Sequence, residues 1–242
     1  MAVAEKISPG YPPGAPVVAS PAAKAHNPSV TFRGWPSEAL EFYEGLTADN
    51  SKTYWTGHKE FYDAQVYAPM VELLAALEPE FGAGRIFRPY RDVRFSRDKA
   101  PYKTHLGAWL EAGGYLQLSA DGLAAGCGMY QMAPDQLDRY RRAVADDRTG
   151  AELTTLIAAV EQAGLGVHGH GTLKTAPRGY PKDHPRLDLL RHKGLTTWRE
   201  WTPAQWLGTA AAKNRIVDFL RTSRPLRQWL DTHVGPSMAD QG

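Results

Sequence analysis

The sequence has one cysteine, almost no excess of charge and no long apolar run, and each of these shortages excludes a class of protein. Cys127 alone can form neither an intramolecular disulfide nor a zinc site built only from cysteines. No segment approaches the roughly 18 apolar residues that a membrane-spanning helix requires. An unbroken apolar region of the kind found in secretory signals is also missing. We therefore expect a cytoplasmic protein that does not enter a membrane.

What is present is an ordinary globular composition that follows an irregular beginning. Of the 242 residues, 43% are apolar, and basic side chains outnumber acidic ones by 28 to 26. A chain of this length buries roughly 70–75% of the surface of its unfolded form, so it builds its own core. Residues 1–30 are interrupted by prolines and glycines and predict a flexible tail. We expect a single domain over residues 31–235 and a disordered end over residues 236–242.

The order of the periodic segments predicts an α+β fold. Apolar residues recur at helical spacing over residues 40–46 and again over residues 54–81. Strand-like segments occupy the middle of the chain. Capping patterns that start at Thr149 and at Thr202 predict two further helices. Helices before and after a run of strands favour a central, mostly antiparallel sheet over alternating strand–helix units.

One β-hairpin of this sheet can be located. Asp121-Gly122 is a strong signal for a two-residue turn, and pairing outward from it sets Ala120 opposite Leu123. In this register one face of both strands is apolar and the other is small or polar. Cys127 lies on the apolar face, so we expect a buried and unreactive thiol. Gly126, on the other face, indicates that a packed helix or a ligand approaches the backbone closely.

Positive charge is concentrated in residues 85–105. Seven basic side chains against two acidic ones give this segment a charge of +5, so the rest of the chain sums to −3. A proline and β-favouring apolar residues within the segment favour an extended strand, with Phe87, Val93 and Phe95 on one face. The opposite face then carries Arg88, Tyr90, Asp92 and Arg94.

Two interpretations of this charged face follow. Arg88 and Arg94 on either side of Asp92 form either a self-neutralised ion network or a bidentate clamp for phosphate or carboxylate. The adjoining loop, residues 96–105, contains more cationic donors than the nearby carboxylates can satisfy. A surplus of donors on a loop beside a sheet is typical of an anion-binding site.

The run from Arg91 to His105, RDVRFSRDKAPYKTH, resembles the signature of the family called domain of unknown function 2461. Residues 50–55, the strand around Cys127 and the run over residues 177–191 resemble its flanking motifs, so the resemblance covers roughly residues 32–230. It implies one compact α+β domain of a kind found in bacteria and fungi, with no settled activity. Cys127 departs from the family pattern, which has a small residue there.

The motif positions are therefore candidate site residues. Those expected to bind a ligand are Arg88, Tyr90, Arg94, Arg97, Lys99, Tyr102 and Lys103. In the first function hypothesis they hold an anionic small molecule, and Asp92 and His105 transfer protons, as a hydrolase or transferase requires.

In the alternative hypothesis the same basic surface binds nucleic acid or an acidic protein partner without chemistry. The small-molecule hypothesis is favoured because the positive charge is local, whereas nucleic-acid binders usually spread it over a wider face. A concave pocket around the motif would support the first hypothesis, and an exposed ridge the second.

No cofactor and no metal are expected. The sequence contains neither a P-loop nor the glycine pattern of a dinucleotide-binding turn. His168 and His170 are two residues apart but lack the supporting carboxylates of a metal site. The tryptophans near the C-terminal end are expected to pack in the core rather than to form a platform for nucleic-acid bases; they are Trp198, Trp201, Trp206 and Trp229.

Overall fold

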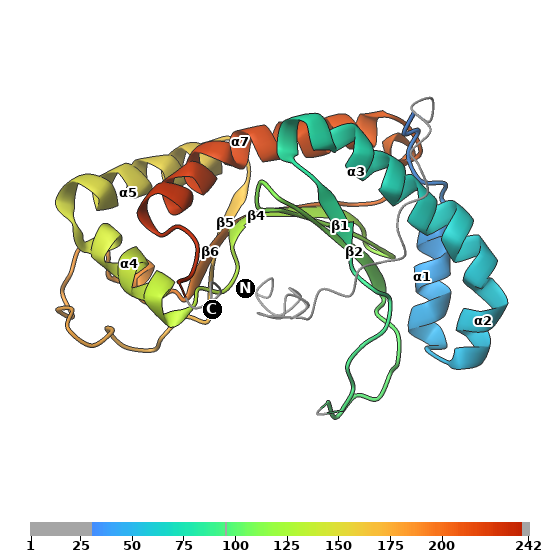
Figure 1. Ribbon diagram of the computed structural model, residues 1–242, viewed down its shortest axis with the longest axis horizontal. Helices are drawn as coiled ribbons and strands as arrows, with labels where there is room; N and C mark the ends of the chain where they lie inside the picture. The colour runs from blue at the N-terminus through green and yellow to red at the C-terminus, as the bar shows by residue number, and fades with distance from the viewer. Residues whose placement is uncertain (1–30, 95, 239–242) are drawn as a thin grey trace.

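Six strands form one antiparallel sheet at the centre of the computed structural model, which describes residues 31–94 and 96–238 (Figure 1). In chain order the strands are β1 (Gly84–Ile86), β2 (His105–Leu110), β3 (Gly114–Ser119), β4 (Gly122–Met129), β5 (Gly166–His170) and β6 (Gly194–Trp201). Their order across the sheet is β1-β2-β3-β4-β6-β5. The tail predicted over residues 1–30 lies outside the described residues.

Helices precede and follow the central strands, which confirms the predicted α+β fold. Before the sheet lie α1 (Glu38–Ala48), α2 (Lys52–Phe61) and α3 (Ala68–Phe81), with a π-helical stretch over Tyr62–Tyr67 between the last two. The later helices are α4 (Pro134–Ala145), α5 (Asp147–Gln162), the short α6 (Leu187–Leu190) and α7 (Ala211–His233), and a 3₁₀ turn covers Gln205–Gly208. Within residues 31–94 and 96–238, no helix is long and apolar enough to cross a membrane.

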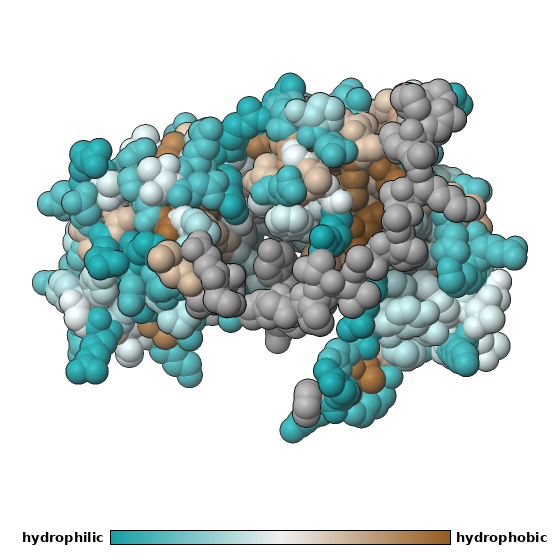
Figure 2. Space-filling model, viewed as in Figure 1, coloured by the Kyte–Doolittle hydropathy of each residue, from teal (hydrophilic) through white to brown (hydrophobic). Residues whose placement is uncertain are grey.

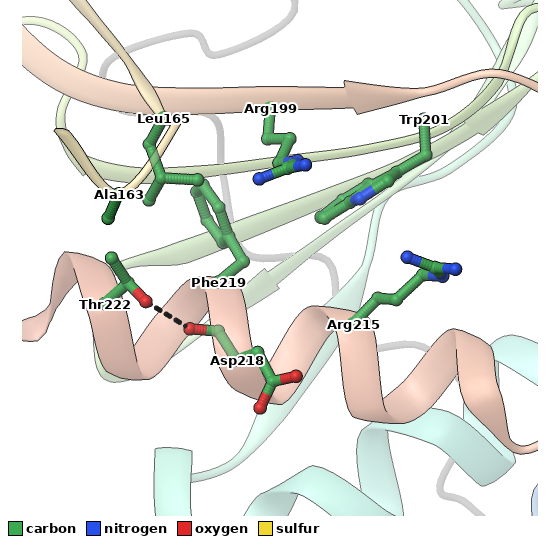
Figure 3. Close-up of a pocket in the computed structure, with 8 residues that line it drawn as sticks. All are labelled: Ala163, Leu165, Arg199, Trp201, Arg215, Asp218, Phe219 and Thr222. Carbon is green, nitrogen blue, oxygen red and sulfur yellow. Dashed lines mark hydrogen bonds between the residues drawn. The ribbon is translucent and has the colours of Figure 1, made fainter. Parts of the chain in front are cut away.

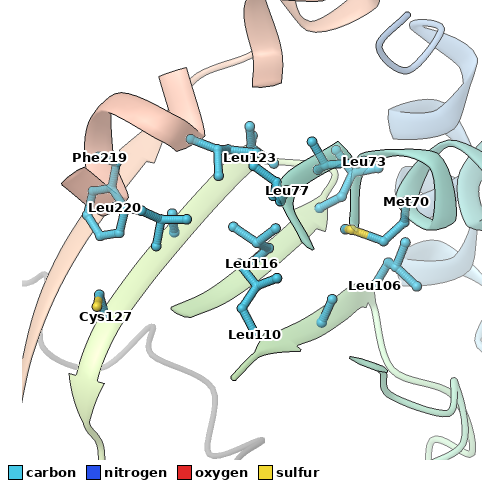
Figure 4. Packing of buried hydrophobic residues seen from close by; sticks show 14 of the residues in the cluster. Met70, Leu73, Leu77, Leu106, Leu110, Leu116, Leu123, Cys127, Phe219 and Leu220 are labelled. Atoms are coloured by element: carbon cyan, nitrogen blue, oxygen red, sulfur yellow. The ribbon is translucent and has the colours of Figure 1, made fainter. Parts of the chain in front are cut away.

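The core lies between one face of the sheet and the layer of α3, α5 and α7, which run together along one side of it (Figure 1). Alternate strand residues point to this side, and Leu106, Leu116 and Leu123 are almost completely buried there. Phe219 and Leu220 of α7 lie over the β4 side of this face, and Met70 of α3 lies beside Leu106 (Figure 4). Since burying one leucine side chain stabilises a fold by about 1.5–3 kcal/mol, this layer holds the helices and the sheet together.

The observed hairpin differs from the predicted one by two residues. Its turn is Ala120-Asp121, so Ser119 pairs with Gly122, whose φ of +110° suits glycine. Side chains alternate along a strand with a period of two, and a shift of two therefore leaves every side chain on its predicted face. Cys127 accordingly lies in the core, which confirms the predicted burial, and burial raises the pKa of its thiol to about 11.

Two of the predicted helix starts are wrong. Asp146 caps α5 by accepting a hydrogen bond from the Thr149 backbone N–H at 2.9 Å, so Thr149 lies inside the first turn rather than at the cap. The helix predicted from Thr202 begins only at Ala211, because the 3₁₀ turn intervenes. The C-terminal end predicted to be disordered from residue 236 includes described residues that contact α4; the Ser237 hydroxyl donates to Asp135.

The opposite face of the sheet, which we call the second face, is turned away from α7. In the observed register, a continuous row across β2, β3, β4 and β6 consists of Trp109, Tyr115, Gly126 and Trp198. Trp201 is three residues from Trp198 and belongs to the helix-covered face, where it pairs with Leu123. The four tryptophans were all predicted to pack in the core, but they lie in different places. Trp229 is buried, whereas Trp198 lies on the second face.

Candidate functional site

The basic motif forms a two-stranded arm that projects from the edge of the sheet, beyond β1 and β2 (Figure 1). We call residues 87–104 the basic arm. Its two segments are joined by backbone hydrogen bonds from Arg91 N–H to the Pro101 carbonyl and from Lys103 N–H to the Pro89 carbonyl, both at 2.8 Å. Figure 2 shows the arm as a largely hydrophilic protrusion from the body of the molecule.

The continuous strand predicted through this motif is wrong. Regular pairing ends at Ile86, and the arm beyond it contains only the isolated bridge between Tyr90 and Tyr102. Pro89 and Pro101 explain this difference, since proline has no N–H to donate to a ladder. The predicted division of charged and apolar side chains between two strand faces therefore does not hold along the arm, and Phe95 lies outside the described residues.

Tyr102 anchors the arm to the helical part of the molecule. The Asn50 side chain imitates a strand partner: its amide donates to the Tyr102 carbonyl at 3.1 Å and accepts from the Tyr102 N–H at 2.9 Å. The Tyr102 ring stacks on Trp55 with centroids 4.6 Å apart and an interplanar angle of 11°. Tyr90 packs beside it at 5.4 Å but is 48% exposed. The two tyrosines predicted to bind a ligand thus have different surroundings, and Tyr102 is buried by the anchor.

At the tip of the arm, most of the charged side chains neutralise one another. The hydrogen bonds from Arg94 to Asp92 include one from Nε to Oδ1 at 3.0 Å, one from Nη2 to Oδ2 at 2.7 Å and one from the backbone N–H to Oδ1 at 3.2 Å. These bonds lower the pKa of Asp92 to about 2. Arg91 forms an ion pair with Asp98 across the loop, through Nη1 alone. A carboxylate held so firmly in its charged form is a weak base.

Two further cations of the tip, Lys99 and Arg97, were also predicted to bind a ligand. Lys99 donates from Nζ to the Val93 carbonyl at 3.0 Å. Arg97 is exposed and forms no ion pair or hydrogen bond with any other described residue. Of these two cations, only Arg97 is thus without a hydrogen-bond partner inside the described chain.

The base of the arm carries two cations that form no ion pair, although the charge of Arg88 contributes to the low pKa of Asp92. Neither Arg88 nor Lys103 forms an ion pair or a side-chain hydrogen bond within residues 31–94 and 96–238. Lys103 is half-buried, with its Nζ 5.3 Å from the centroid of the Phe87 ring. Burial, together with the charge of Arg88, lowers the pKa of Lys103. Burial and the charge of Lys103 lower the pKa of His105 to about 4, so this imidazole is neutral at pH 7.

The structure does not bring Asp92 and His105 together as the proton-transfer hypothesis requires. Arg91 lies opposite Pro101, so Asp92 lies opposite Ala100 and further towards the tip. Five residues of extended chain separate Ala100 from His105, which corresponds to roughly 16 Å. His105 is the first residue of β2 and pairs with Ser119 at the base of the arm.

Comparison with known proteins identifies the family. The family model described as "Conserved hypothetical protein (DUF2461)" matches residues 38–229, which include the whole basic arm. The chain belongs to the DUF2461 family. No curated protein and no solved structure matches it. The function of this DUF2461 domain must therefore be argued from its own side chains.

Beside the base of the arm, the second face of the DUF2461 domain carries an aromatic strip, by which we mean Phe87, Tyr115 and Trp198. The ring centroids of Phe87 and Tyr115 are 6.3 Å apart, and those of Tyr115 and Trp198 are 6.1 Å apart with an interplanar angle of 20°. Sequence reasoning missed this strip. The signal that could have found it is the spacing of Trp198 and Trp201, because residues three apart on a strand point to opposite faces.

A cavity of about 210 Å³ lies on the other side of the sheet, between α7, β6 and the end of α5 (Figure 3). Arg199 and Trp201 reach into it from β6, and Arg215 and Phe219 from α7 (Figure 3). Both arginines lie over tryptophan rings, Arg199 over Trp201 at 5.7 Å and Arg215 over Trp206 at 4.6 Å. None of the residues that line this cavity belongs to the basic motif.

His168 and His170 lie in β5 (Gly166–His170). The His170 ring is 2.7 Å from the Thr196 hydroxyl, and burial lowers the pKa of His170 to about 4. Across residues 31–94 and 96–238, no three His, Cys, Asp or Glu side chains are arranged to hold a metal ion.

Proposed function

We propose that this DUF2461 protein binds a phosphate- or carboxylate-bearing ligand at the base of the basic arm. In this proposal Arg88 and Lys103 contact the anion, and His105 lies beside them. The observation that carries it is that neither of these neighbouring cations forms an ion pair or a side-chain hydrogen bond with a described residue, although one of them is half-buried. A half-buried ammonium beside a second cation destabilises the unliganded protein, and an anion between them would reverse this effect.

The neutralised cations of the tip are not needed for this binding. Arg94 and Arg91 already have carboxylate partners, and an incoming anion would have to compete with Asp92 and Asp98 for them. Asp92 receives no proton-transfer role in the proposal, since Arg94 holds it as a carboxylate far from His105. The proposed activity is therefore binding.

A second candidate function is binding of a polyanion, either nucleic acid or an acidic protein. The projecting shape of the arm favours it, because an extended ligand could continue from Arg88 and Lys103 along the exposed ridge to Arg97 (Figures 1 and 2). The two candidates share the contacts at the base and differ in whether the tip contributes.

The test removes one charge at the base and one at the tip. Lys103→Met keeps the aliphatic stem over Phe87 but removes the ammonium, and Lys99→Met is the matched control at the tip. Pyrophosphate should raise the melting temperature of the wild type and of Lys99→Met. Calorimetry should show a loss of affinity of about ten-fold or more in Lys103→Met, as expected for one charge-assisted contact.

The unliganded stability of Lys103→Met separates a binding site from a structural one. We expect this variant to be at least as stable as the wild type without ligand, because it removes an unpaired, half-buried charge. If pyrophosphate stabilises nothing and Lys103→Met melts at a lower temperature, Lys103 supports the fold and the proposed site is wrong.

A further inference from the structure

We propose that the anionic ligand is a nucleotide unit, free or within a single strand, whose base stacks on the aromatic strip of the second face. This inference rests on the proposed function, because Arg88 and Lys103 would hold the phosphate. It adds the class of the ligand, which the cations alone do not specify.

The cations and the aromatic strip are continuous. Phe87 belongs to both: Lys103 Nζ lies over its ring at 5.3 Å, and the Tyr115 ring follows at 6.3 Å. From Tyr115 the strip continues across β4 to Trp198 on β6. A ligand with its phosphate at the base of the arm would therefore extend its planar part over these rings.

The Tyr115 and Trp198 rings lie close to the backbone of the neighbouring strands. A Cβ atom on Gly126 would be 2.8 Å from an atom of the Trp198 ring, which shows that the indole lies across β4 at this position. A Cβ atom on Gly107 would likewise be 3.1 Å from the Tyr115 hydroxyl. Glycine at both positions lets the rings approach the backbone. This is the close approach that Gly126 indicated in the sequence, and a side chain supplies it.

Polar neighbours hold the two rings in orientation. The Tyr115 hydroxyl donates to Gln117 Oε1 at 3.0 Å, and the Trp198 indole N–H donates to Glu200 Oε1 at 3.1 Å. Both rings are half-buried, so part of each remains accessible. Oriented aromatic rings beside unpaired cations are the combination by which proteins bind nucleotide bases and phosphates together.

The test compares ligands that share a phosphate and differ in the base. Wild-type protein is titrated with pyrophosphate, ribose 5-phosphate, AMP and an eight-nucleotide DNA strand, by calorimetry and by quenching of tryptophan fluorescence. Stacking should make AMP bind about ten-fold tighter than ribose 5-phosphate. Tighter, salt-dependent binding of the DNA strand would identify the single strand as the source of the nucleotide, and binding no tighter than AMP would identify the free nucleotide.

Substitutions of Trp198 test whether the aromatic strip causes the preference for AMP over ribose 5-phosphate. Trp198→Leu should remove the preference for AMP and leave the affinity for ribose 5-phosphate unchanged, whereas Trp198→Phe should retain most of it. Trp206→Leu is the matched control, because Trp206 lies outside the second face. Rescue by phenylalanine, together with unchanged melting temperatures, excludes a folding defect.

The two proposals fail in different ways. If ribose 5-phosphate and pyrophosphate bind but AMP binds no tighter, the nucleotide inference is wrong and the anion site stands. If polyglutamate binds as tightly as the DNA strand, the ligand is an acidic chain and the inference is again wrong. If no phosphate compound binds, the anion site itself is wrong.

Discussion

The tip and the base of the basic arm carry the same kinds of side chain but differ in their counter-charges. At the tip, Arg94 and Arg91 each have a carboxylate within hydrogen-bond distance, and the pairs are exposed. At the base, Arg88 and Lys103 form no ion pair with a described carboxylate, and burial of Lys103 makes this more costly. Most of the charged residues of the segment lie around the tip. The cations that form no ion pair, and that an anionic ligand could therefore neutralise, include both cations of the base.

This difference shows that the cations of a basic motif must first be separated into those that form ion pairs within the protein and those that do not. Only then can the motif be assigned a function. An exposed arginine that already has a bidentate carboxylate gains little from a further anion, because solvent and its partner have satisfied its donors. An unpaired, half-buried ammonium gains the full energy of its contact with an anion, because it gives up no existing partner. Substitutions at the base, at the anchor and at the tip of the arm should therefore differ in their effects.

The largest effect is expected when both cations of the base are removed. The double variant Arg88→Met with Lys103→Met should lose pyrophosphate binding by about a hundred-fold or more, since two charge-assisted contacts are each worth about 1.5–3 kcal/mol. The control removes the same charge from the tip, by Arg94→Met with Lys99→Met, and calorimetry should show almost unchanged affinity. Equal losses in the two double variants would mean that the net charge of the arm, and not its pairing, attracts the anion.

The two ends of the arm should also differ in the pH at which they affect stability. The pKa of His105 is about 4 in the fold and near 6.5 in the unfolded chain, so the unfolded state takes up the proton first as the pH falls. The free energy of unfolding should therefore decrease between pH 6.5 and pH 4, by about 3 kcal/mol at most from this group. His170 contributes in the same range.

Urea titrations at pH 7 and pH 5 measure this effect. His105→Gln should lose part of the decrease, and the remainder belongs to His170 and His192, whose pKa values burial also lowers. Asp92 contributes stability that is present above its unfolded pKa near 4 and disappears only towards pH 2, so Asp92→Asn should leave the pH 7 to pH 5 difference unchanged. A pH dependence that survives His105→Gln undiminished would show that His105 is not shielded from protonation.

The anchor of the arm should have an intermediate effect. Asn50→Ala removes both hydrogen bonds to the Tyr102 backbone and should lower the free energy of unfolding by about 2 kcal/mol, because a partly buried N–H and C=O lose their partner. Asn50→Asp restores only the acceptor and should recover part of the loss. Chemical denaturation measures both variants, and an unchanged stability in Asn50→Ala would mean that the stacking of Tyr102 on Trp55 suffices to hold the arm.

These comparisons also show which parts of the molecule could be predicted from the sequence. The buried faces of the hairpin follow from alternation alone, so they survived an error of two residues in register. The basic segment is recognisable from composition. The pairing of its charges is not, because Arg91 and Asp98 meet only through the path of the loop between them.

The aromatic strip and the anchor depend on contacts that are still more distant in the chain. Asn50 meets Tyr102 across 52 residues, and Tyr115 meets Trp198 across a third strand between them. None of these four residues is unusual in its local sequence, so periodicity and turn signals contain no information about the two contacts. Strand order and register decide the contact of Tyr115 with Trp198, and the packing of the segment between α1 and α2 against the arm decides that of Asn50 with Tyr102.

The smallest effect is expected at Arg94, although the sequence makes it the centre of the motif. If the Arg94–Asp92 pair were buried, Arg94→Ala would leave an uncompensated carboxylate and unfold the protein. The pair is exposed, with 76% of the arginine side chain and 46% of the aspartate side chain accessible, so water can solvate Asp92 after the substitution. Thermal denaturation should therefore give a melting temperature within about 2 °C of the wild type. Calorimetry with pyrophosphate should give an affinity within about two-fold, because the guanidinium is already engaged by Asp92. A loss of binding comparable to that of Lys103→Met would show that Arg94 leaves Asp92 for the ligand, and the site would then extend over the whole arm.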